Sequence, residues 1–117
     1  MTEFTELGKY PSDDAEAGDR AVLDQLAQHG ADLSKETEFI HFLYFDDEAS
    51  TRAVVDQLGQ IGYRGGARQT EDGAFVIQAE RDEVPSMENV RRMRQFMETI
   101  AAHFGGEYDG WEAAVTK

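Results

Sequence analysis

Side chains that could take part in chemistry gather near the end of the chain, in the segment Glu107-Tyr108-Asp109-Gly110-Trp111. A pair of carboxylates such as Glu107 and Asp109 is the arrangement with which glycosidases flank a substrate. No activated nucleophile with a neighbouring base accompanies them, however. Asp109 is better explained as an acceptor of backbone hydrogen bonds at a turn or bulge. We therefore expect no catalytic residues, and a hydrolase is the weakest of the functions considered.

Histidines are the other residues that could bind a metal or transfer protons. The three histidines, His29, His41 and His103, are scattered along the chain, and there is no cysteine. A zinc site needs clustered ligands with short loop spacings. His103 near a helix C-terminus is more simply a side chain that compensates the helix dipole. We expect neither a metal site nor a cofactor.

Three further patterns do not indicate a catalytic or binding site. Ser86 precedes a long amphipathic segment, where its hydroxyl is expected to cap a helix. The pairs Gly65-Gly66 and Gly105-Gly106 do not have the spacing of phosphate-binding loops. The cluster Arg91, Arg92 and Arg94 is expected on a solvated helix face, because Glu88 to Arg92 and Arg94 to Glu98 are i, i+4 pairs.

The periodicity of apolar residues predicts the elements that position these side chains. Asp13 with Glu16 three residues later is a capping-box pattern, and Asp46 and Asp47 can cap a second helix. Asp72-Gly73 is typical of a hairpin turn. The predicted elements are a helix over 13–29, a strand over 37–45, a helix over 46–61, strands over 63–70 and 74–81, a helix over 86–104 and a strand over 107–115.

This order predicts an α+β fold of the ferredoxin-like type, βαββαβ, with an extra N-terminal helix. Four antiparallel strands would carry two helices on one face. The strand over 37–45 is apolar on both sides, so the front helix, with Phe42 or Tyr44, is expected to cover part of the other face. We expect a flexible tail over 1–12 and a single domain over 13–117, with its core over 37–117.

The charge distribution limits the partners. The net charge is −13, and residues 1–48 hold thirteen acidic and three basic residues. Binding to nucleic acid relies on lysines and arginines that neutralise phosphates, so direct contact with nucleic acid is not expected. An acidic surface can instead attract a basic protein partner, although many acidic surfaces serve only solubility. No long apolar run or signal-peptide pattern is present, and we expect a cytoplasmic protein that does not contact membranes.

The block Glu107-Tyr108-Asp109-Gly110-Trp111 and the helix before it resemble the bacterial family known as regulator of ribonuclease activity B. The start of a helix at Asp46-Asp47 and the acidic front helix support the resemblance more loosely. The resemblance implies a small non-enzymatic protein that binds ribonuclease E, inhibits it and thereby modulates RNA decay. The familiar enterobacterial form continues into a long acidic tail, whereas this sequence ends at Thr116-Lys117, and whether inhibition requires that tail stays open.

We therefore expect a partner-binding surface in this chain, with a ribonuclease E-type endoribonuclease as the partner. The alternative is a ferredoxin-like module that binds a small metabolite or an unrelated protein, with an apolar pocket near Tyr108 and Trp111. Neither the oligomeric state nor the contacting face is predicted. The expected partner-binding residues are Asp13, Asp14, Glu16, Asp46, Asp47, Glu107, Tyr108, Asp109 and Trp111.

Overall fold

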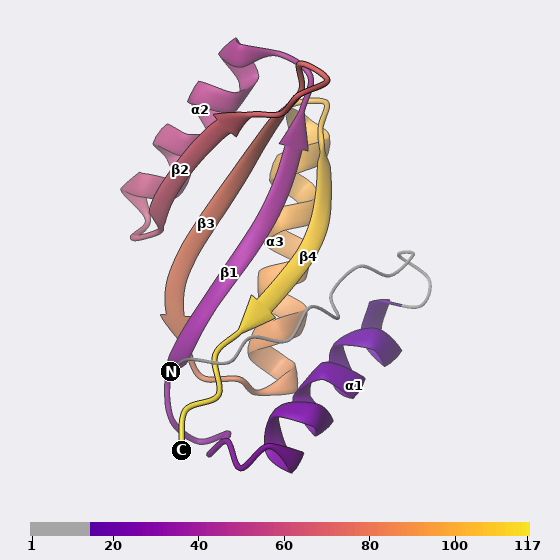
Figure 1. The fold of residues 1–117 in the computed structure, drawn as a ribbon, viewed down its shortest axis with the longest axis vertical. Helices are drawn as coiled ribbons and strands as arrows, with labels where there is room; N and C mark the ends of the chain where they lie inside the picture. Colours follow the sequence, from indigo (N-terminus) through magenta and orange to yellow (C-terminus); the bar gives the residue numbers. More distant parts are fainter. Residues whose placement is uncertain (1–14) are drawn as a thin grey trace.

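The computed structural model describes residues 15–117, which form three helices and one sheet (Figure 1). The tail predicted over 1–12 and the cap predicted at Asp13 lie outside these residues. The elements, in chain order, are α1 (Ala15–Gln28), β1 (Thr37–Phe45), α2 (Glu48–Gln60), β2 (Arg64–Gln69), β3 (Phe75–Glu83), α3 (Met87–His103) and β4 (Glu107–Ala113).

The four strands form an antiparallel sheet in the order β2-β3-β1-β4. The strand with apolar residues on both faces, β1, lies in the middle, where it pairs with β3 along its whole length and with β4 on its other side. On each face of the sheet, the side chains of a central strand are flanked by side chains of both neighbouring strands. This packing favours aromatic and β-branched residues. The predicted ferredoxin-like fold with an N-terminal helix is confirmed.

The predicted N-terminal caps of α2 and α3 are also confirmed. The side chain of Asp47 accepts a hydrogen bond from the Ser50 backbone N–H at 2.8 Å, and the Ser86 hydroxyl accepts one from the Asn89 N–H at 3.1 Å. Each bond satisfies a backbone donor that the first helical turn leaves unpaired. The two expected helix starts therefore follow from local capping chemistry.

The position of α1 differs from the expectation. Val22, Leu26 and Trp111 share a buried cluster with Phe39 of β1 and Val90 of α3. Phe39 lies on the same face of β1 as Leu43, which packs against α2 and α3, because residues two apart in a strand share a face. All three helices therefore cover one face of the sheet, and α1 does not cover the other face.

Beside α1, the final strand contains the irregularity that its glycine predicts. His41 pairs with Trp111 and Leu43 pairs with Tyr108, so β4 holds one more residue than β1 between these pairs. Gly110, inside this β-bulge, has a φ of 101°. The extra residue turns both Tyr108 and Trp111 toward the helices, although three positions separate them in the sequence.

We expect Gly110→Ala to lower the free energy of unfolding by roughly 1–2 kcal/mol, because a Cβ atom is disfavoured at this positive φ. Urea unfolding followed by far-ultraviolet circular dichroism measures the change. Gly66→Ala is the matched control, since an added Cβ there meets nothing within 4 Å and the φ of Gly66 is not positive. Equal effects of the two substitutions would contradict this account of the bulge.

Candidate protein-binding surface

Exposed carboxylates gather at the end of the sheet where β1 ends and β4 begins. Figure 1 shows that the turn between β2 and β3 lies at this same end. Tyr44 pairs with Glu107 across β1 and β4, and Phe45 pairs with Phe75 next to the turn between β2 and β3. These pairings bring three separate loops to one end of the molecule. The acidic end, as we call it, consists of Asp46, Asp47, Glu48, Glu71, Asp72 and Glu107.

Most carboxylates of the acidic end are not neutralised by a neighbouring cation among the described residues. Hydrogen bonds from Ser50 hold the pKa of Asp47 below its usual range, and hydrogen bonds from Thr70 and Ala74 do the same for Asp72. Glu48 pairs with Arg52 one helical turn later. For the other members, no ion pair is found among the described residues. The end therefore presents a negative field to a partner.

The structure brings only some of the expected partner-binding residues together. Asp46, Asp47 and Glu107 belong to the acidic end, and Asp109 follows on β4, half-buried. Glu16 lies elsewhere, on α1, where it pairs with Arg91 in the first half of α3. Asp13 and Asp14 lie outside the described residues.

Tyr108 and Trp111 point into the molecule. The Trp111 side chain is 2 % exposed and packs against the Phe39 ring, with the ring centroids 5.0 Å apart. The Tyr108 hydroxyl lies 2.8 Å from Nδ1 of His41. The visible role of both aromatic residues is therefore to hold β4 against β1 and the helices, and their contact with a partner stays a prediction.

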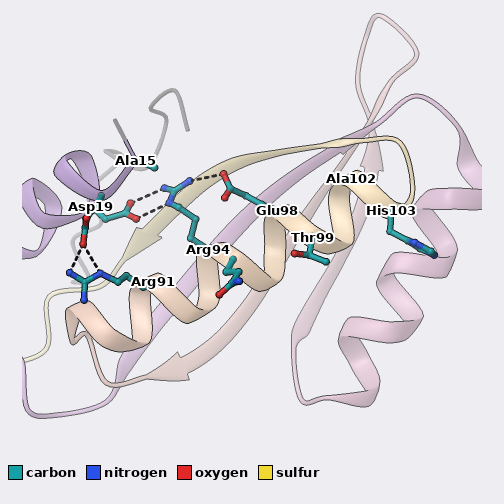
Figure 2. Close-up of a pocket in the computed structure, with 10 residues that line it drawn as sticks. Ala15, Asp19, Arg91, Arg94, Glu98, Thr99, Ala102 and His103 are labelled. Atoms are coloured by element: carbon teal, nitrogen blue, oxygen red, sulfur yellow. Dashed lines mark hydrogen bonds and ion pairs between the residues drawn. The ribbon is translucent and has the colours of Figure 1, made fainter. Parts of the chain in front are cut away.

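A buried ion pair joins α1 to α3 (Figure 2), and it contacts both of these aromatic residues. Nε and Nη2 of Arg94 each donate to one carboxylate oxygen of Asp19, both at 2.7 Å. The indole Nε1–H of Trp111 donates to the same carboxylate at 2.9 Å. A guanidinium and a carboxylate joined by two parallel bonds are well matched in geometry as well as in charge.

The same guanidinium also lies over the Tyr108 ring, 5.2 Å from its centroid. Burial alone would lower the pKa of Arg94, but the hydrogen bonds and charge of Asp19 outweigh burial and raise it. Burial raises the pKa of Tyr108 well above its ordinary value. Arg94 is thus a permanent cation inside the protein, and Tyr108 is a neutral donor or acceptor beside it.

The burial of Arg94 contradicts the expectation that Arg91, Arg92 and Arg94 all lie on a solvated face of α3. Arg94 lies inside, 8 % exposed, and its pairing with Glu98 is only a longer contact of 3.8 Å. Arg92 donates to Asn89 instead of pairing with Glu88. The sequence did contain a signal, since Asp19 precedes the apolar Val22 and Leu23 by one helical turn and Arg94 follows Val90 by one.

A cleft of about 800 Å³ lies between the start of α1 and α3, and Asp19 and Arg94 are among the residues that line it (Figure 2). Arg91, Arg94 and Glu98 line it together with Thr99 and His103. Most of its lining side chains are polar or charged. It therefore differs from the apolar pocket that the metabolite-binding alternative predicts near Tyr108 and Trp111.

His41 completes the buried polar network. Its side chain is 1 % exposed, and burial followed by the nearby charges of Arg81 and Arg94 lowers its pKa to about 3. Its ring Nε2 has no hydrogen-bond partner. The histidine is therefore neutral at physiological pH, and its contacts are those of a core residue.

Comparison with known proteins identifies the family. Residues 16–113 match the protein family described as Regulator of ribonuclease activity B. The chain belongs to this family. The match includes the buried network, since Asp19, His41, Arg94, Tyr108 and Trp111 all fall within it. No individual curated protein matches the chain.

Membership in this regulator family implies that the chain regulates ribonuclease activity through an interaction with a ribonuclease. None of the helices in residues 15–117 is long and apolar enough to cross a bilayer. In the same range, no three histidine, aspartate or glutamate side chains gather closely enough to hold a metal ion.

Proposed function

We propose that this protein is a non-enzymatic inhibitor that binds a ribonuclease E-type endoribonuclease and slows RNA decay. The observation that carries the proposal is the match to the regulator family over residues 16–113. The proposed contact surface is the acidic end, which faces a basic region of the enzyme. Its exposed carboxylates supply long-range attraction, which speeds association and selects basic partners.

The geometry of the acidic end supports this choice. Asp46 follows a central strand, and Glu107 begins the neighbouring one, so the backbone of the sheet fixes their separation. The cap that Asp47 forms on α2 fixes a third carboxylate beside them. A rigid set of charges loses little conformational entropy when it binds. The partner would contact these carboxylates directly and compete with RNA or with another protein for the basic region.

A titration with the endoribonuclease of the source organism tests the proposal. The enzyme is divided into its catalytic and scaffold halves, and each half is titrated at low and at moderate salt while RNA cleavage is measured. Saturable binding to one half, with reduced cleavage, is the expected result. Failure of the folded protein to bind either half would refute the proposed partner.

Charge reversal tests the proposed contact surface. We expect Asp46→Lys with Glu107→Lys to weaken binding by about tenfold at low salt and to reduce its salt dependence, because two attractive contacts become repulsive. Asp24→Lys with Glu36→Lys is the matched control, since both residues are exposed, lie outside the acidic end and change the net charge equally. Equal weakening by both pairs would mean that only the net charge matters.

A further inference from the structure

The edge strand β2 has an unusual exposed surface. It pairs only with β3, and all six of its residues, Arg64–Gln69, are exposed. Alternate residues of an edge strand direct their backbone N–H and C=O groups away from the sheet, where they can pair with another extended chain. β2 therefore offers a row of backbone donors and acceptors.

The side chains of β2 do little to block this row. Gly65, Gly66 and Ala67 are too small to cover the edge. Arg64 directs its guanidinium over the sheet toward Asp82 and Glu38, at 3.5 and 3.8 Å, and so away from the edge. No proline or bulge interrupts the pairing of β2 with β3. The devices with which many proteins protect edge strands are thus missing along the centre of β2.

A groove of about 470 Å³ runs beside this edge, between β2 and α2. Val55 of α2, Ala67 of β2 and Phe75 of β3 supply its apolar lining, and Glu48, Arg52 and Asp56 of α2 supply charges of both signs. Ala67 pairs with the buried Ile77, so it lies on the helix-covered face of the sheet. A strand added next to β2 would send every second side chain toward this groove.

The charge of β2 indicates what the added strand would carry. The strand holds two arginines and no acidic residue, in a chain whose net charge is −13. Arg68 lies on the open face, opposite Val76, and no carboxylate forms an ion pair with it among the described residues. An acidic side chain on the added strand would meet this guanidinium.

We propose that β2 and the neighbouring groove bind an extended peptide segment of another protein by strand addition. The segment places small apolar side chains in the groove, and on its other face an acidic residue next to Arg68. Backbone hydrogen bonds supply affinity, and the groove and Arg68 supply selectivity, as in other proteins that recognise peptides through a sheet edge. Glu48 lines this groove and also belongs to the acidic end, so the two surfaces adjoin, but the proposal does not depend on the identity of the ribonuclease.

Charge argues against a second copy of the chain as the occupant. Two antiparallel β2 strands would bring Arg64 and Arg68 of both copies onto one face without any acidic residue between them. Like charges opposite one another destabilise paired strands. A peptide with a carboxylate and alternating valines avoids that repulsion and uses the groove.

The acetylated and amidated peptide Ser-Thr-Val-Glu-Val-Thr-Val-Ser is a suitable probe. It is titrated into the isotopically labelled protein while backbone amide resonances are recorded. We expect saturable shifts confined to residues 64–69 and the start of α2, and weaker binding when lysine replaces the glutamate of the peptide. Arg68→Glu should weaken binding by roughly fivefold, which combines a lost attraction with a new repulsion.

Two controls distinguish the site from general effects of charge. Arg20→Glu changes the net charge equally at an exposed position on α1 and should leave peptide binding unchanged. Ala67→Tyr fills the groove and should reduce binding without altering the fold, because Ala67 is exposed. The proposal is overturned if the β2 amides do not shift, if the lysine peptide binds equally well, or if sedimentation shows a dimer formed through β2.

Discussion

Asp19→Ala is expected to lower the free energy of unfolding by roughly 3–5 kcal/mol. The substitution leaves the Arg94 guanidinium inside the protein without its carboxylate, and it removes the acceptor of the Trp111 indole N–H. The contact of Arg94 with Glu98 at 3.8 Å does not replace the two parallel bonds to Asp19, so much of the hydration that the cation lost on burial stays uncompensated. Urea unfolding followed by circular dichroism measures the difference, which should appear as a lower midpoint.

A double-mutant cycle separates the ion pair from its surroundings. Arg94→Met alone should be costly, because it leaves the Asp19 carboxylate buried with only the indole donor. Asp19→Leu combined with Arg94→Met should cost much less than the sum of the single changes, since no buried charge remains. Arg94→Lys should not restore stability, because an ammonium cannot form the two parallel bonds.

The ion pair between Glu16 and Arg91 provides the matched control for Asp19 and Arg94. It joins the same two helices, but both of its side chains are more than half exposed. Exposed pairs contribute little to stability, so Glu16→Ala should cost less than about 1 kcal/mol. Equal losses in the free energy of unfolding for Asp19→Ala and Glu16→Ala would contradict this account of the buried pair.

Acid should destabilise the fold well above the pH at which carboxylates titrate. The pKa of His41 is about 3 in the folded protein, whereas a histidine in an unfolded chain titrates near 6.5. Between these values the unfolded state binds a proton that the folded state does not bind. Stability is therefore complete above about pH 6.5 and falls by about 1.4 kcal/mol for each pH unit below it, until pH reaches about 3.

Urea unfolding at pH 7, 6 and 5 tests this slope. Over that range His41 should contribute a loss of roughly 2 kcal/mol, before the lowered pKa values of Asp32, Asp47 and Asp72 begin to matter. His41→Gln should flatten the pH dependence even though it lowers stability at pH 7. The exposed His29 is the control, and His29→Gln should leave the slope unchanged. A slope that survives in His41→Gln would assign the effect to other groups.

The sequence was sufficient to predict the order of elements because its signals are local. Asp47 and Ser86 precede apolar stripes and cap the helices that follow. Gly110 interrupts a strand pattern and marks the bulge. Such signals depend on neighbours within a few residues, so a single sequence contains them in full.

The position of α1 and the buried network depend on contacts between distant residues. Asp19 and Arg94 are 75 residues apart, and each could be explained alone as part of a solvated helix surface. Only the packing of α1 beside α3 makes them partners. For the same reason the expectation that α1 covers the open face failed, since apolar residues on β1 do not indicate which face a helix will occupy.

The sequence indicated which acidic residues could contact a partner, but only partly which of them lie together on the surface. Asp46, Asp47 and Glu107 meet because β1 and β4 are neighbours, which follows from the ferredoxin-like order. Glu16 lies on another part of the surface because α1 packs on α3. Tyr108 and Trp111 face the interior because the bulge turns both of them that way. Their part in partner binding remains a prediction.

The hydrogen bond between Trp111 and Asp19 gives the protein an internal optical probe. Trp111 is the only tryptophan in the sequence, and its indole N–H meets a side chain from α1. If α1 separated from the sheet before the strands did, the intrinsic fluorescence of the indole would shift toward longer wavelengths while the circular dichroism of the strands persisted. Comparing the two signals would reveal whether the front helix unfolds with the domain or ahead of it.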